Sequence, residues 1–180
     1  MNANFLPILD WTDAKCGDIG FYAGASVLSD LIEEFQPGTG PDGSWSPSHA
    51  FIVRDQDSVV EADASGMCEV ASAEKYAAGL PTGQCALFRP TCDVMPLARA
   101  ALLNWMVQKY GNRPYPWWNL IGFGIQRLFG LADNPISCGD VCSQIAWFYL
   151  SYLDAALVAG LRRRDCDPVK LFDLVSGAHP

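Results

Sequence analysis

The sequence predicts a single α+β domain over residues 1–180, because the two halves of the chain differ in character. Short apolar segments separated by turns occupy the first half, which is typical of an antiparallel sheet. The second half carries longer apolar patterns at helical spacing. Half of the 180 residues are apolar and 18% are charged, which is enough for one substantial core. Strands followed by helices favour α+β over alternating α/β.

The first half of the chain is expected to contain the sheet. Strands are predicted at 18–23, 50–54, 58–62, 66–70 and 85–89, with tight turns between several of them. One helix interrupts them at 26–35, where Ser26 can act as its N-cap. The Gly- and Pro-rich stretch at 36–48 excludes regular structure.

The second half is expected to be helical. Apolar periodicity predicts helices at 95–110, 140–158 and 169–175, with Gly111 as a C-cap and Pro168 at a helix start. Residues 112–116 form a Pro-rich connector, which an apolar segment follows to residue 131.

The charge of the chain excludes some partners. A net charge of −8 and a pI near 4.5 argue against nucleic acid, since phosphate binding needs clustered Lys and Arg. The most apolar stretch, 145–161, is interrupted by Asp154 and has a polar face, so no integral membrane span is expected. The amino terminus lacks a signal-peptide pattern, which predicts a cytoplasmic protein as synthesised.

Seven cysteines form no even framework and no C-x-x-C pair. This favours reduced thiols, most of them buried as small apolar groups. Cys138 and Cys142 with His49 could be considered for zinc, but their spacing is not that of common zinc modules, so no metal is expected. The nucleotide-binding and serine-hydrolase motifs are also missing, and no cofactor is expected.

His49 is the strongest candidate for proton transfer. The chain has two histidines, and the other, His179, is the penultimate residue, where chains usually fray. His49 follows a turn-forming Ser-Pro-Ser run and opens an apolar strand. A histidine there can also simply hydrogen-bond the turn.

Cys142 is the best candidate nucleophile, because it falls in the first turn of the expected helix near 140. Unpaired N–H groups and the helix dipole favour a thiolate there. Ser143 and Gln144 follow, and a backbone N–H in such a turn can help to hold an oxyanion. Cys138 is the local rival, and a buried structural thiol at 142 is an equally frequent outcome.

Glu61 lies twelve residues after His49, in an apolar strand that would form a hairpin with the strand of His49. A carboxylate at that position can hold the imidazole tautomer so that the other ring nitrogen faces the thiol. Asp63 shares the sheet face of Glu61 and is the second candidate. An outward-pointing strand residue is the structural alternative.

Several motifs together resemble the circularly permuted papain-like proteins of the NlpC superfamily, especially the YiiX-like branch. The matching pieces are Cys16-Gly17-Asp18-Ile19-Gly20-Phe21, Ser48-His49-Ala50-Phe51-Ile52-Val53, Val59-Val60-Glu61-Ala62, Arg113-Pro114-Tyr115, Val141-Cys142-Ser143-Gln144-Ile145 and Asp167-Pro168-Val169-Lys170-Leu171. Their order over nearly the whole chain carries the resemblance. It implies a papain-like fold, in which an N-terminal antiparallel sheet packs against C-terminal helices that include the nucleophile helix.

The resemblance also implies roles for individual residues. Cys142 would be the nucleophile, His49 the base and Glu61 the orienting acid, with Tyr115 lining the site. The chain departs from the family at Gln144, where Glu is frequent, and in a longer loop at 36–47.

Ser143 and Trp117 are added as substrate-contacting candidates, and Trp118, Phe123 and Phe129 could join Trp117 at an apolar entrance. Packing in the core is the more frequent fate of such aromatic side chains.

The expected function is that of a cysteine amidase or peptidase without a cofactor, acting on a peptide or acyl-amide substrate such as a bacterial cell-wall peptide. A lipid-directed thiol acyltransferase or esterase of the same fold is an alternative. A non-enzymatic module in a phage or secretion assembly is another. A wall-directed enzyme would need phage lysis or a dedicated secretion system to reach its substrate.

Overall fold

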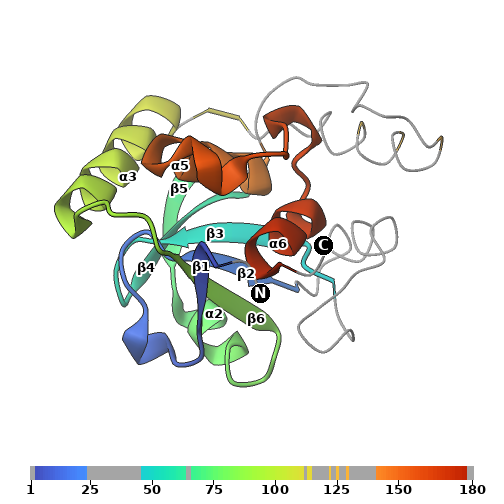
Figure 1. Ribbon diagram of the computed structural model, residues 1–180. Coiled ribbons are helices and arrows are strands. Elements are labelled where there is room, and N and C mark those ends of the chain that lie inside the picture. The colour runs from blue at the N-terminus through green and yellow to red at the C-terminus, as the bar shows by residue number, and fades with distance from the viewer. Residues whose placement is uncertain are drawn as a thin grey trace.

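The computed structural model describes residues 3–23, 46–63, 66–111, 113–114, 122, 125, 129 and 141–177. Within these residues six strands form one antiparallel sheet in the order β1-β6-β2-β3-β4-β5 (Figure 1). The strands are β1 (Phe5–Ile8), β2 (Ile19–Tyr22), β3 (His49–Val53), β4 (Ser58–Asp63), β5 (Gly66–Ser72) and β6 (Cys85–Pro90). The predicted α+β class and antiparallel sheet are confirmed.

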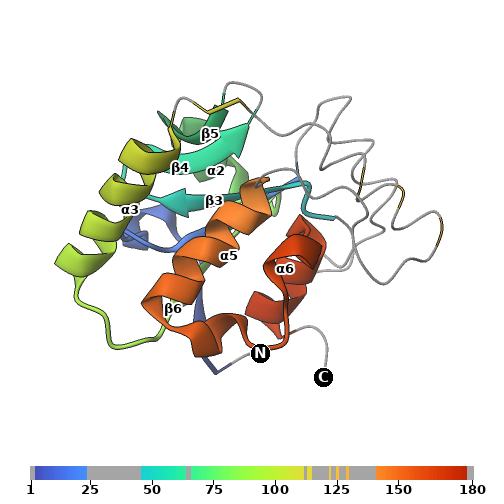
Figure 2. The same ribbon diagram turned by 90° about the horizontal axis from the view of Figure 1, so that it is seen from above.

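Helices cover both faces of this sheet in the described part of the chain. They are α2 (Glu74–Gly79), α3 (Pro96–Tyr110), α5 (Cys142–Leu153) and α6 (Pro168–Ser176), with short 3-10 turns η1 (Trp11–Asp13), η2 (Ala155–Val158) and η3 (Arg163–Asp165). The C-terminal helices α3, α5 and α6 lie on one face and the short α2 on the other (Figures 1 and 2). Helix α5 packs across β3, β4 and β5.

Two apolar cores result from this arrangement, because successive strand residues point to opposite faces. In β3, Ala50 and Ile52 join the core that the C-terminal helices close, whereas Phe51 and Val53 join the core beneath α2. Both faces are covered, and β3 therefore shows an unbroken apolar run instead of alternation.

Strand β1 and helix α2 were not expected from the sequence. In β1, Pro7 interrupts the apolar pattern, which argues against a central strand. The strand pairs with β6 alone, with Phe5 opposite Pro90, and an edge position tolerates the proline. Helix α2 has only six residues, too few for a periodic pattern. Its Ala73 N-cap makes no side-chain hydrogen bond, and the Glu74 N–H donates instead to Ser72 Oγ at 3.3 Å.

The prediction that one helix runs to residue 158 was wrong. Helix α5 ends at Leu153, and Asp154 adopts an extended backbone. The Asp154 carboxylate accepts a 2.9 Å hydrogen bond from the Ala156 N–H and so starts the separate turn η2. The helix predicted at 26–35 lies outside the described residues, as does most of the apolar segment that ends at residue 131.

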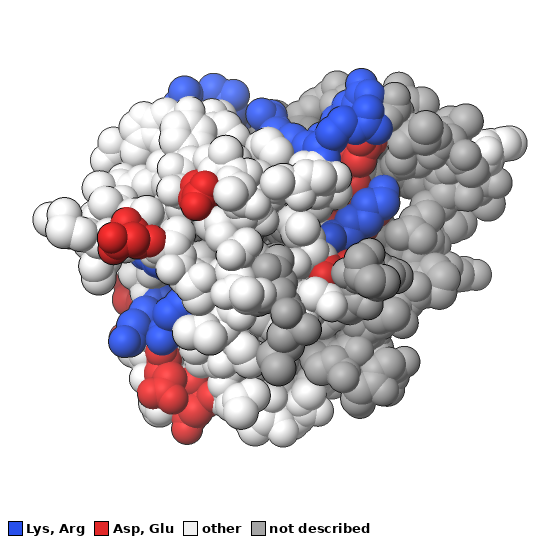
Figure 3. Space-filling view, in the orientation of Figure 1, with Lys and Arg blue, Asp and Glu red and all other residues white. Residues whose placement is uncertain are grey.

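The acidic charge of the chain is not gathered into one surface on the face drawn in Figure 3. Acidic side chains of the described residues form small separate groups there, with basic side chains among them and uncharged surface between. In the described part of the chain, no helix has the length and apolar character needed to cross a membrane.

Candidate functional site

The register of the β3–β4 hairpin brings His49 and Glu61 together. Phe51 lies directly opposite Glu61 in the ladder, and His49 is two residues earlier on the same strand. Diagonal neighbours of this kind share a sheet face and lie within reach of long side chains. The distance from His49 Nε2 to Glu61 Oε2 is 2.5 Å, as the predicted pairing required.

Glu61 is a buried carboxylate with several donors. Its side chain is 2% exposed, the Tyr76 hydroxyl donates to Oε2, and Lys75 Nζ lies 3.7 Å from Oε1. Burial alone raises the pKa of Glu61, but the hydrogen bond and charge of His49, the Tyr76 hydroxyl and the Lys75 charge lower it to about 2. Glu61 is therefore ionised at neutral pH, and it is not the outward-pointing residue of the structural alternative.

His49 contacts the candidate nucleophile. Burial lowers the pKa of His49, but the charge of Cys142, a side-chain hydrogen bond with Cys142 and the contact with Glu61 together raise it to about 10. Because Nε2 faces Glu61, Nδ1 is the ring nitrogen left for the thiol. The His49 ring lies nearly parallel to the Tyr76 ring, with centroids 6.1 Å apart and planes 11° apart. Because the pKa of His49 is about 10, the imidazole beside the Cys142 sulfur is protonated at neutral pH.

Cys142 is the first residue of α5, in agreement with its predicted place in a helix start. The preceding Val141 is the N-cap and has no polar side chain. Its N–H donates a 3.0 Å hydrogen bond to Gln144 Oε1, and Gln144 Nε2 donates in turn to the Arg163 carbonyl at 2.9 Å. Gln144 thereby holds the first turn of α5 in place from within the helix.

Ser143 does not present its hydroxyl to the dyad. The side chain is fully buried, and Oγ donates a 2.7 Å hydrogen bond to the carbonyl of Cys166. The hydroxyl ties α5 to the segment before α6, so any contact of Ser143 with a substrate falls to its backbone. Its backbone N–H remains in the first helical turn, where N–H groups have no intrahelical acceptor.

Tyr76 and Lys75 were missed by the sequence reasoning. Both belong to α2, which is too short to give a periodic signal. Tyr76 is fully buried and stacks on Phe51, with ring centroids 3.9 Å apart. A tyrosine beside a lysine in a six-residue segment carries no local sign that it will reach Glu61.

Several predicted positions lie outside the described residues. They are Tyr115, Trp117, Trp118, Phe123, Cys138 and His179. The side chain of Asp63, the second candidate for orienting the imidazole, is also outside them. Phe129 is described and is 73% exposed. Among the described residues, no three or more His, Cys, Asp and Glu side chains are grouped closely enough to hold a metal ion.

The arrangement places a thiol, an imidazole and a buried carboxylate in series at a helix N-terminus. Such a series can form a nucleophile, hold its base in one tautomer and offer backbone N–H groups to a developing oxyanion. Comparisons with protein-family models, with curated proteins and with solved structures found no match for this chain.

Proposed function

We propose that this protein is a cysteine hydrolase of the permuted papain-like type, which cleaves an amide bond in a small peptide or acyl amide. The observation that supports the proposal is the position of the His49 ring. One ring nitrogen binds the buried Glu61, and the ring also forms a hydrogen bond with Cys142 at the start of α5. This is the geometry that a thiol nucleophile and its base need.

The proposed reaction begins with the Cys142 thiolate attacking the carbonyl carbon of the amide. A carbon–sulfur bond forms, and negative charge develops on the carbonyl oxygen, to which the first-turn N–H groups of Cys142 and Ser143 can donate hydrogen bonds. The protonated His49 then gives its proton to the amine as the carbon–nitrogen bond breaks. The acyl group remains on the sulfur as a thioester.

Hydrolysis of the thioester completes the cycle. His49, now neutral, removes a proton from water as the oxygen attacks the thioester carbonyl. The carbon–sulfur bond breaks and releases the carboxylic acid and the thiolate. Glu61 remains ionised throughout, because its pKa is about 2. Its contact with Nε2 holds the imidazole in one orientation.

The limited exposure of Cys142 and His49 supports the proposal that the substrate is small. Cys142 is 5% exposed and the His49 side chain 19% exposed. A folded protein surface would not fit against groups so far recessed, whereas a short peptide or a small acyl amide presents a narrow carbonyl. Cell-wall stem peptides belong to this class of substrate.

Alkylation of the seven thiols by iodoacetamide near neutral pH, followed cysteine by cysteine with mass spectrometry, tests the proposal. We expect Cys142 to react faster than the partly exposed Cys16 and Cys92, although it is the most buried of the three. The variant His49→Ala should slow Cys142 and leave Cys16 and Cys92 unchanged. Equal rates at the three thiols would refute the nucleophile.

The substrate class needs a second experiment. Wild type and Cys142→Ala are incubated with stem peptides and, separately, with phospholipids, and the intact mass of the protein is recorded after rapid acid quenching. A mass increase on the wild type alone identifies the acyl group carried by the thioester. An acyl chain from phospholipid in place of a peptide would replace the amidase proposal with a lipid-directed one.

A further inference from the structure

A cleft of about 480 Å³ lies apart from the Cys142 site and shares no residue with it. Its walls come from the connection between β1 and β2, the turn after β3, the end of β6 and the first residues of α3. His49 begins β3 and Arg54 follows it, so at about 3.3 Å per residue the two residues are roughly 17 Å apart along the strand. The volume is in the range of small-molecule sites.

The lining of this cleft is rich in cations, although the chain as a whole carries a net charge of −8. Four cationic side chains and two carboxylates contribute to it: Lys15, Arg54, Arg89, Arg99, Asp18 and Asp55. The lining of the cleft therefore has an excess of positive charge, whereas the chain as a whole is negatively charged. This excess positive charge is available to a ligand only where a cationic side chain has no ionic partner within the protein.

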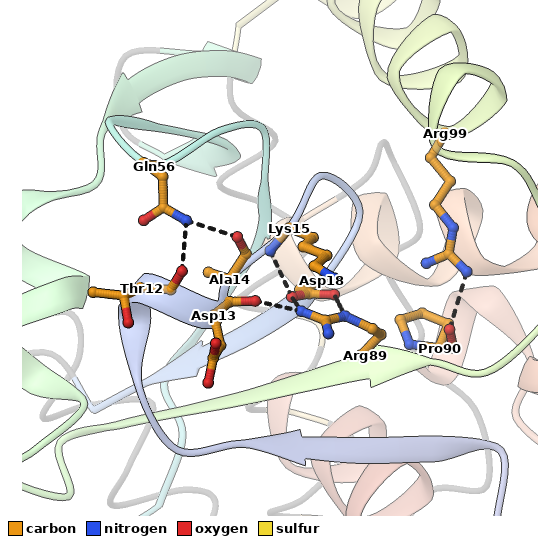
Figure 4. A network of polar contacts seen from close by, with 9 residues as sticks. All are labelled: Thr12, Asp13, Ala14, Lys15, Asp18, Gln56, Arg89, Pro90 and Arg99. Atoms are coloured by element: carbon orange, nitrogen blue, oxygen red, sulfur yellow. Dashed lines mark hydrogen bonds and ion pairs between the residues drawn. The ribbon is translucent and has the colours of Figure 1, made fainter.

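Arg89 and Asp18 neutralise each other. Arg89 Nε donates to Asp18 Oδ1 at 2.9 Å and Nη2 donates to Oδ2 at 2.8 Å, a two-point contact shown in Figure 4. Asp18 is fully buried, and its Oδ2 also accepts the backbone N–H of Lys15 at 2.8 Å. The Asp18 carboxylate is thus used within the fold.

Arg99 is different, because its hydrogen bonds go to neutral groups. It is 8% exposed, and its guanidinium donates to the backbone carbonyls of Val94 (3.2 Å), Pro90 (3.0 Å) and Cys92 (3.1 Å). Figure 4 shows its bond to Pro90, beside the Asp18–Arg89 pair. Within the described ranges no carboxylate forms an ion pair with Arg99 or with the Lys15 ammonium. A buried cation without a counter-charge is costly.

Arg54 is only partly compensated. It is exposed and lies near Asp55, whose carboxylate also accepts the Asp57 N–H at 3.0 Å. Both groups face water, where the attraction between an exposed pair is weak.

Apolar groups complete the walls of the cleft. Ala14, Val94 and Pro96 contribute hydrocarbon surface between the charged side chains. A ligand that fits the cleft therefore needs an apolar part as well as a negative charge.

We propose that this cleft binds a small organic anion, a carboxylate or phosphate on a short apolar body, with Arg99, Lys15 and Arg54 around the charged group. The anion supplies the counter-charge that Arg99 and Lys15 do not find among the described residues, and the apolar body lies against Ala14, Val94 and Pro96. The proposal does not depend on hydrolysis at Cys142.

Isothermal titration of the full chain with hexanoate, hexyl phosphate, inorganic phosphate and hexanol tests the proposal. We expect saturable binding of hexanoate or hexyl phosphate, weaker binding of inorganic phosphate and none of hexanol. Comparison of the first two distinguishes a carboxylate site from a phosphate site. Binding of hexanol as strong as that of hexanoate, or no saturable binding of either anion, would overturn it.

Variants locate the binding. Arg99 also holds the chain between β6 and α3, so its replacement could unfold the protein, and the exposed Lys15 and Arg54 are changed instead. The double variant Lys15→Gln/Arg54→Gln should bind about tenfold more weakly. Lys109→Gln, on the exposed surface of α3 and outside the cleft, removes one charge as a control and should bind as the wild type does. Equal affinity of the double variant and the wild type would contradict the assignment.

Alkylation gives an independent readout, because Cys16 lines the cleft and is only partly buried. A saturating concentration of the bound anion should slow alkylation of Cys16 while the rate at Cys142 stays the same. Protection of both thiols to the same extent would point to a general effect of the salt and count against the site.

Discussion

Glu61 shows at the scale of one residue how burial and hydrogen bonding combine. A carboxylate that is 2% exposed would ordinarily take up a proton, because burial disfavours its charge. Tyr76, His49 and Lys75 reverse that preference, and the pKa falls to about 2. The buried charge is kept because each of its oxygens has a donor or a cation nearby.

Removal of the Tyr76 hydroxyl tests its role in positioning Glu61. In Tyr76→Phe the carboxylate loses one donor, so the pKa of Glu61 rises and the imidazole is held less firmly. We expect kcat of the proposed amidase to fall about tenfold with little change in KM, and the carboxyl carbon of Glu61 to titrate at higher pH in ¹³C NMR. Tyr152→Phe, a change at an exposed position on α5, serves as the control. An unchanged titration of Glu61 would show that the hydroxyl only fills space.

Replacement of Glu61 by glutamine isolates its charge. Glu61→Gln keeps the size of the side chain, and the negative charge that helps to raise the pKa of His49 is lost. The pKa of His49 should therefore fall below its value of about 10, although the contributions of Cys142 remain. ¹H–¹⁵N NMR of the imidazole can follow this change. Lys75→Met should change it much less, because Lys75 is 54% exposed and its charge is screened. A pKa of His49 unchanged in Glu61→Gln would exclude the pairing.

Helix α5 shows at the scale of an element how one side chain can fix a helix start. Gln144 accepts the Val141 N–H through Oε1, as a carboxylate at this position could also do. Its Nε2 adds a bond to the Arg163 carbonyl that a carboxylate could not make. The amide therefore links the start of α5 to the turn η3.

Substitutions at Gln144 test this capping role. Gln144→Ala should lower the free energy of unfolding by about 1 kcal/mol and slow the alkylation of Cys142, because the first turn of α5 frays. Gln144→Glu keeps the acceptor for Val141 and should lie between wild type and Gln144→Ala. Gln108→Ala on the exposed surface of α3 is the control. Chemical denaturation measures stability, and a loss in Gln108→Ala equal to that in Gln144→Ala would contradict the cap.

The elements that the sequence predicted are those with strong local patterns. β3 and β4 are apolar runs bounded by polar turns, and α6 has Pro168 at its start with Asp167 as N-cap. β1 and α2 were not predicted because their local patterns are weak. Pro7 breaks the apolar pattern of β1, and the six residues of α2 are too few to show helical periodicity.

At the scale of the whole molecule, the His49–Glu61 pair should make the stability of the protein depend on pH. The pKa of His49, which Cys142 raises most and Glu61 raises further, adds stability below about pH 6.5 that is lost as pH rises through about 10. The lowered pKa of Glu61 adds stability above about pH 4.5, which is lost as pH falls through about 2. The contribution of the pair is therefore largest between these limits, from about pH 4.5 to 6.5.

Thermal unfolding of wild type and His49→Ala/Glu61→Gln across the pH range measures that contribution. The difference in Tm should be greatest near pH 5.5 and should shrink in strong acid and above pH 9. A constant difference at every pH would mean that the two side chains act only through packing.

The sequence by itself determined the α+β class, the antiparallel hairpins and the presence of Cys142 at a helix start, because each follows from side-chain periodicity and turn residues within a short stretch. It also made His49 the candidate base of the proposed reaction, because His49 follows a turn-forming run and opens an apolar strand. Only the tertiary structure decided that His49 meets Cys142, that Tyr76 reaches Glu61 and that Arg99 lines a cleft. These contacts join segments far apart in the chain, and they depend on packing between elements, for which no local pattern exists.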